Sequence, residues 1–170
     1  MRISLMRTVA VGFAAIALIS VTSSAWQSFH TDGISVHYPS GWHATTRPLT
    51  AVTSPQEALV VASYPFPRQT IADNCNPTSS LAALPAIGAL IFVWEYPPRA
   101  TPRSSFPPRP KRFKIGHLGN PECFGPRTAI VAFRQAGRFF QINITLGRRA
   151  TSATRATVVR ILDSLTIKPA

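Results

Sequence analysis

The stretch that decides the fold is residues 128–167, which read TAIVAFRQAGRFFQINITLGRRATSATRATVVRILDSLTI. The pair Ala136-Gly137 separates two apolar runs, which predicts a tight two-residue hairpin with Gln135 opposite Arg138. This register places three apolar pairs on one face: Phe133 with Phe140, Val131 with Ile142 and Ala129 with Ile144. The other face mixes polar and apolar side chains, so the first face is predicted to be core.

A helix is predicted to follow the hairpin. Its apolar residues recur at the spacing of a single helix face: Val158, Ile161, Leu162 and Leu165. Either Thr151 or Ser152 would be the N-cap, since a hydroxyl oxygen can accept from a free backbone N–H in the first turn. The apolar face of the hairpin is the natural partner for this helix.

The N-terminal residues have the pattern of an export signal. Arg2 and Arg7 precede an apolar run over residues 9–21, and Ser23-Ser24-Ala25 supplies the small residues of a cleavage site. This predicts a secretory signal peptide over residues 1–25 and a secreted or extracytoplasmic envelope protein. An uncleaved membrane anchor is the alternative, although the run is shorter than the roughly 20 residues that a spanning helix needs.

Residues 26–170 are enough for one domain with one core. Four extended segments bounded by Gly and Pro precede Pro65, and a short helix is expected near residues 78–84. The apolar run 89–96 is typical of a strand in the middle of a sheet. We therefore expect an α+β fold, a mostly antiparallel sheet of about six to seven strands with two helices packed on it.

Cys75 and Cys123 are the two cysteines of the chain. After export, an even pair predicts a disulfide. A catalytic thiol is the alternative, but neither cysteine has a neighbouring helix start and base that would favour the thiolate.

Two short patterns suggest a family. They are residues 33–42, GISVHYPSGW, and residues 159–165, VRILDSL, in a chain with this order of strands and helices. Together they resemble the exported bacterial PsbP/Mog1-like α/β sandwich proteins. The resemblance implies that the first pattern opens the sheet, that the second closes the fold as a helix, and that the role is binding or assembly rather than catalysis. The cysteine pair and the basic proline-rich loop have no counterpart in the family's pattern.

A Pro- and Arg-rich loop at residues 97–114 carries the most distinctive polar residues. Six prolines between residues 97 and 110 make regular structure improbable there. The candidate polyanion-binding residues are Arg99, Arg103, Phe106, Arg109, Lys111, Arg112, Phe113 and Lys114. Cations beside exposed rings suit an anionic chain, since charges release its counterions and rings offer flat contact surfaces. The alternative is a solvated loop that only keeps the protein soluble.

Catalytic and metal chemistry have weak support. The six acidic residues are scattered, and no known catalytic or metal motif is present. Glu95 ends an apolar strand and is expected at the rim of the sheet, with a buried position as the alternative. Of the four histidines, His37 is expected opposite Gln27 rather than opposite another histidine. We therefore predict no catalytic residues, no metal and no cofactor.

The expected function is non-enzymatic binding or scaffolding in the cell envelope. Without the signal, 16 Lys and Arg stand against 6 Asp and Glu. This balance favours an anionic envelope polymer or a membrane surface as partner, without a specific nucleic acid. No protein partner is predicted. The alternatives are a small extracellular hydrolase, which a pocket lined by Glu95 and a histidine would favour, and a small-ligand carrier.

Overall fold

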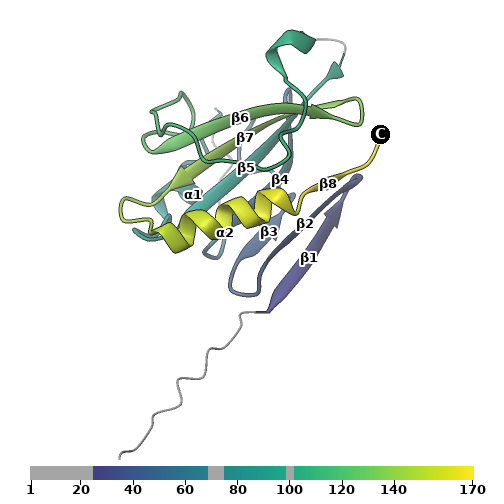
Figure 1. The fold of residues 1–170 in the computed structure, drawn as a ribbon. Coiled ribbons are helices and arrows are strands. Elements are labelled where there is room, and N and C mark those ends of the chain that lie inside the picture. Colours follow the sequence, from purple (N-terminus) through teal and green to yellow (C-terminus); the bar gives the residue numbers. More distant parts are fainter. Residues whose placement is uncertain (1–24, 69–74, 99–101) are drawn as a thin grey trace, which may run out of the picture.

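The computed structural model describes residues 25–68, 75–98 and 102–170 (Figure 1). The predicted signal peptide therefore lies almost wholly outside the described residues. The elements, in order, are β1 (Trp26–Thr31), β2 (Ile34–Pro39), β3 (His43–Thr45), β4 (Gln56–Ala62), α1 (Thr78–Ala82), β5 (Ala89–Tyr96), η2 (Arg103–Ser105), β6 (Thr128–Gln135), β7 (Arg138–Leu146), α2 (Ser152–Asp163) and β8 (Thr166–Ile167).

The strands form two antiparallel sheets rather than one. The larger sheet has the order β3-β4-β5-β7-β6, and the smaller has the order β1-β2-β8. The mixed helix and sheet class is confirmed. The sequence predicts six to seven strands in one sheet, whereas the described residues contain eight strands in two sheets. The second sheet forms because the first hairpin pairs with β8 instead of with the larger sheet.

The β6–β7 hairpin has the predicted register. Gln135 lies opposite Arg138, and Phe133 lies opposite Phe140. Ala136 and Gly137 both have positive φ, 52° and 78°, as a two-residue turn of type I′ requires. Local turn chemistry therefore sets this register.

The first hairpin differs from its expected register. His37 pairs with Ser28, and Gln27 pairs with Tyr38, so the expectation of His37 opposite Gln27 is wrong by one residue. The cause is the turn, because Asp32 and Gly33 alone form it, both with positive φ.

Helix α2 covers the front face of the larger sheet (Figure 1). The side chain of Thr151 is its N-cap, since Thr151 Oγ1 accepts from the Thr154 backbone N–H at 3.1 Å. The predicted apolar stripe is fully buried: Val158, Ile161, Leu162 and Leu165. It shares one core with β2, β4, β5, β6 and β7.

A second core lies on the back face of the larger sheet. Strand β5 is the third of five strands and is buried on both faces, as its apolar run predicted. On the back, Phe92, Trp94 and Phe124 form a cluster of edge-to-face rings with centroids 5.2 to 5.7 Å apart. Phe124 reaches this cluster from the loop that precedes β6.

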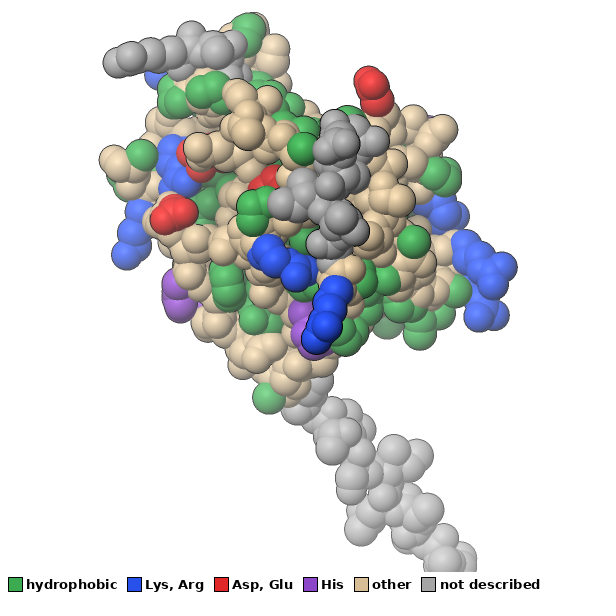
Figure 2. Space-filling view, turned by 180° about the vertical axis from the view of Figure 1, so that it is seen from behind, with side chains coloured by type: hydrophobic (Ala, Val, Ile, Leu, Met, Phe, Trp, Pro, Cys, Tyr) green, Lys and Arg blue, Asp and Glu red, His purple; other side chains and the backbone are tan. Residues whose placement is uncertain are grey.

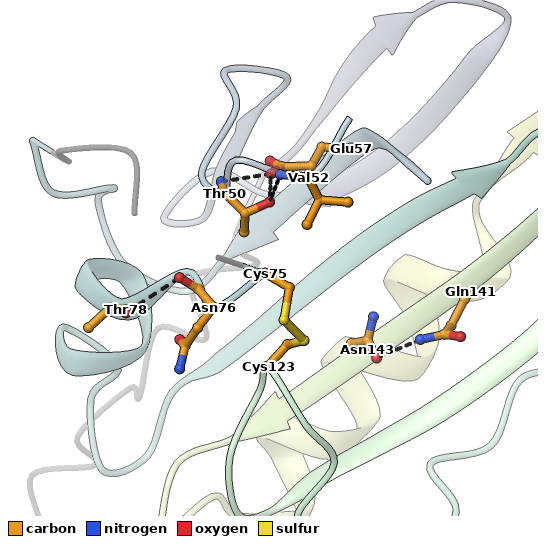
Figure 3. Close-up of a disulfide and its surroundings, with 9 residues drawn as sticks. All are labelled: Thr50, Val52, Glu57, Cys75, Asn76, Thr78, Cys123, Gln141 and Asn143. Atoms are coloured by element: carbon orange, nitrogen blue, oxygen red, sulfur yellow. Dashed lines mark hydrogen bonds between the residues drawn. A yellow bond between two sulfur atoms is a disulfide. The ribbon is translucent and has the colours of Figure 1, made fainter. Parts of the chain in front are cut away.

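A disulfide joins the two loop segments that lie over this second core (Figure 3). Cys75 and Cys123 are bonded, with their Cα atoms 5.2 Å apart, which confirms the predicted pairing. Cys75 lies on the segment that leads into α1, and Cys123 directly precedes Phe124. The bond therefore fixes two loops over the same part of the sheet.

Replacing both cysteines by Ser is expected to lower the free energy of unfolding by about 2 to 4 kcal/mol, because the disulfide closes a loop of 48 residues. Urea unfolding of the double variant, beside the oxidised wild type, measures this difference. The wild type in a reductant should match the variant. An unchanged midpoint would contradict the prediction.

Candidate anion-binding site

The basic loop crosses the edge of the larger sheet. We call its described part, residues 102–114, the strap. Arg134 on the edge strand β6 donates its backbone N–H to the Pro107 carbonyl at 2.8 Å and accepts from the Arg109 N–H at 3.1 Å. The strap therefore occupies backbone groups that an exposed edge would offer to another chain.

Two phenylalanines anchor the strap on opposite faces of the sheet. Phe106 is 6% exposed and packs on Tyr96 and Phe139 on the back face. Phe113 is 2% exposed and packs on Phe133 in the front core. The expectation that both rings are exposed contact surfaces is therefore wrong. Burying each ring stabilises the fold by roughly 1.5 to 3 kcal/mol, and this stabilisation would be lost if the ring were exposed to water.

Arg109 also has a structural role. Its guanidinium donates to the backbone carbonyls of Leu162, Asp163 and Leu165 at the C-terminal end of α2, and to Gln135 Oε1 at 2.9 Å. The last carbonyls of a helix lack partners within the helix, and a cation there also suits the helix dipole. Burial lowers the pKa of Arg109, and the negative charge of Asp163 raises it by a smaller amount. Arg109 therefore fastens the strap to α2.

A further bond holds the strap beside α2. The Phe113 backbone N–H donates to Asp163 Oδ1 at 2.8 Å. Asp163 is thus occupied by the strap backbone. Its carboxylate therefore stabilises the strap, and within the described part of the chain it forms no ion pair with a lysine or arginine.

Four cations remain directed to solvent: Arg103, Lys111, Arg112 and Lys114. Among the described residues, the one ion pair joins Arg138 to Glu95, so none of the four is neutralised by an acidic side chain. Arg99 lies outside the described residues. The candidate set thus divides into three anchors, the buried Phe106 and Phe113 and the half-buried Arg109, and an outer group of four cations.

Glu95 and Arg138 form a buried ion pair that sequence reasoning missed. Arg138 Nε and Nη2 donate to the two carboxylate oxygens of Glu95 at 2.7 and 2.6 Å. Arg138 Nη1 donates to the carbonyls of Asp32 and Lys168, so this side chain also joins the two sheets. The hydrogen bonds that Arg138 donates to Glu95 raise the pKa of Arg138, and burial acts against this effect.

The alternation of side chains could have revealed this pair. Arg138 lies on the face of Phe140 and Ile142, and Glu95 lies on the face of Ile91 and Val93. Two opposite charges therefore lie at adjacent ends of two paired strands, and both lie on the face of the sheet that is packed against the core. The missing information was the pairing of β5 with β7, which no local pattern indicates.

A cleft of about 510 Å³ adjoins this ion pair between the ends of the sheets, and Asp32 and Glu57 also line it. No histidine is among its lining residues, and both oxygens of Glu95 accept from Arg138. Glu57 accepts from the backbone N–H and the hydroxyl of Thr50, with the N–H at 2.7 Å (Figure 3). It also accepts from the Leu49 N–H at 2.7 Å. The cleft therefore lacks the combination of Glu95 and a histidine that would have favoured a hydrolase.

The histidines lie apart on the surface. His30, His37, His43 and His117 are exposed, and His37 Nδ1 lies 3.2 Å from Ser28 Oγ. Within residues 25–68, 75–98 and 102–170, no three His, Cys, Asp or Glu side chains are grouped as metal ligands would be. Nor does that part of the chain contain a helix of the length and apolar content needed to cross a membrane.

Comparison with protein-family models, with curated proteins and with solved structures found no match to this chain.

Proposed function

We propose that this protein is a non-enzymatic, exported envelope protein that binds an anionic polymer through the four outward cations of the strap. The observation that carries the proposal is that the strap contains two groups of residues with different roles. One group holds the strap to the rest of the fold: Phe106, Arg109 and Phe113. The other group is exposed and forms no ion pair with an acidic side chain in the described part of the chain: Arg103, Lys111, Arg112 and Lys114. Because the strap backbone is held in place, its cations bind an anionic chain with less loss of conformational entropy than those of a flexible loop.

The proposal includes an extracytoplasmic location and membership of the PsbP/Mog1-like family. The charged and apolar N-terminal residues and the formation of a disulfide favour an extracytoplasmic location. The antiparallel strands, the closing helix α2 and the two short sequence patterns favour membership of the PsbP/Mog1-like sandwich proteins.

The buried rings favour a polymer over a membrane surface. Proteins that lie on membranes insert apolar side chains beside their cations. The two rings of the strap are instead 6% and 2% exposed. Contact through the strap is therefore expected to depend on charge alone, without insertion or ring stacking.

Binding to inorganic polyphosphate is expected to weaken by roughly fifty-fold between about 50 and 200 mM salt, if four cations release counterions as on a single-stranded polyanion. Changing Arg103, Lys111, Arg112 and Lys114 to Ser should remove most of this affinity and most of the salt dependence. Fluorescence anisotropy with a labelled polyphosphate chain measures both. Arg109 is left intact, because its removal would disturb α2.

The matched control removes the same charge elsewhere, by changing the exposed Arg47, Arg68, Arg149 and Lys168 to Ser. This variant should keep most of the affinity. Equal losses in the two variants would mean that net charge, rather than the strap, attracts the polymer, and no binding would refute the proposal. Tighter binding to phosphatidylglycerol vesicles than to polyphosphate would point to a membrane surface instead.

A further inference from the structure

A groove of about 470 Å³ lies on the opposite side of the sheet from α2. One wall is formed by Leu81 and Leu84, from α1 and the residues after it. The other wall is formed by Phe124 and Pro126, and the end of β7 at Leu146 lies between them. The volume and the apolar lining are those of a site for a small ligand.

The disulfide joins the two walls of this groove. Cys75 precedes α1, Cys123 precedes Phe124, and the bond between them links the wall-forming segments covalently (Figure 3). The end of β7 is also fastened to the segment after α1, because the Gly147 N–H donates to the Gly88 carbonyl at 2.9 Å. The walls are thus fixed in position without a ligand.

Two arginines supply positive charge beside the apolar lining. Arg148 lines the groove and is exposed. Arg127 Nε donates to the carbonyls of Leu146 and Gly147 at 3.3 and 3.2 Å, which places its guanidinium at the same end of β7. Glu122 lies on the same loop as Arg127 but forms no ion pair with either arginine in the described part of the chain. Figure 2 shows hydrophobic and basic side chains side by side on this rear face.

We propose that this groove binds a single-chain anionic amphiphile, namely a carboxylate on an unbranched apolar tail. The tail lies against Leu81 and Leu84, which are partly exposed, and it removes their apolar surface from water. The carboxylate lies at Arg148, which lines the groove, since a guanidinium matches a carboxylate in shape and charge. The positive charge of Arg127 at the same end of β7 adds to the attraction. Charge complementarity selects this occupant over a neutral or cationic apolar molecule. The site is separate from the strap and does not depend on its function.

Decanoate is the test ligand, titrated into the purified full-length protein by isothermal calorimetry below its micelle concentration. Decyltrimethylammonium is the matched control ligand, with the same chain length and the opposite charge. Decanoate is expected to bind at least about tenfold more tightly than the control, as one charge-assisted contact would produce. No binding of decanoate, or equal affinities for both tails, would overturn the proposal.

Three variants locate the site. Arg148→Glu and Leu84→Ser are each expected to weaken decanoate binding by about tenfold, through the headgroup and the tail respectively. Arg68→Glu is the control for Arg148→Glu, because it makes the same change of charge at an exposed residue outside both the groove and the strap. It should leave the decanoate affinity unchanged. If Arg68→Glu weakens binding as much as Arg148→Glu, decanoate is attracted by net charge and the groove is not its site.

Discussion

Val158→Asp is expected to abolish the folded state, with loss of the cooperative thermal transition followed by circular dichroism. Val158 is 0% exposed in the interface between α2 and the larger sheet. The substitution loses roughly 1.5 to 3 kcal/mol of apolar burial and adds several kcal/mol for an unpaired buried carboxylate. Their sum approaches the entire stability of an ordinary domain, about 5 to 15 kcal/mol.

Ala156→Asp is the matched control, since it places the same residue on the exposed side of α2. It should lower the free energy of unfolding by less than about 1 kcal/mol, the difference in helix propensity. A normal melting transition for Val158→Asp would mean that α2 does not pack on the sheet as described.

Arg138→Met is expected to lower the free energy of unfolding by about 3 to 5 kcal/mol, because it leaves the Glu95 carboxylate without its partner in a mostly buried place. The Arg138 and Glu95 side chains are 6% and 20% exposed. The variant also loses the bonds to the Asp32 and Lys168 carbonyls that join the two sheets. Urea unfolding measures the change.

The double variant Arg138→Met with Glu95→Leu separates the ion pair from these other bonds. Replacing both charges by apolar side chains removes the unpaired carboxylate, so most of the stability should return. A residual loss of about 1 kcal/mol for each missing bond to a carbonyl is expected. Two results would contradict this account of the ion pair. One is an Arg138→Met variant as stable as the wild type, and the other is a double variant less stable than Arg138→Met alone.

Some of the fold follows from short-range patterns. The β6–β7 register follows from Ala136-Gly137, and α2 from its N-cap and its apolar spacing. The central place of β5 follows from its unbroken apolar run. Each of these depends on residues close in the sequence, whose conformations are set by sterics and by the period of side-chain direction.

The strap shows where such patterns fail. Phe106 and Phe113 interleave with cations, a pattern that equally suits exposed rings on a binding loop. Their burial depends on β6 being an edge strand that the chain can cross, which is a property of sheet order. The role of Arg109 likewise depends on the end of α2 lying beside residues that precede it by more than 50 positions.

By itself, the sequence determined the hairpin, the packing face of α2, the pairing of its two cysteines and the excess of positive charge. The tertiary structure alone decided which basic residues are not paired with an acid, which acid pairs with Arg138, and that a groove with arginines beside it forms between segments that the disulfide joins. The physical reason is the distance along the chain over which each kind of interaction acts. Turn geometry and side-chain periodicity act over a few residues, whereas burial, ion pairing and cavity shape depend on segments that meet only when the sheets are assembled.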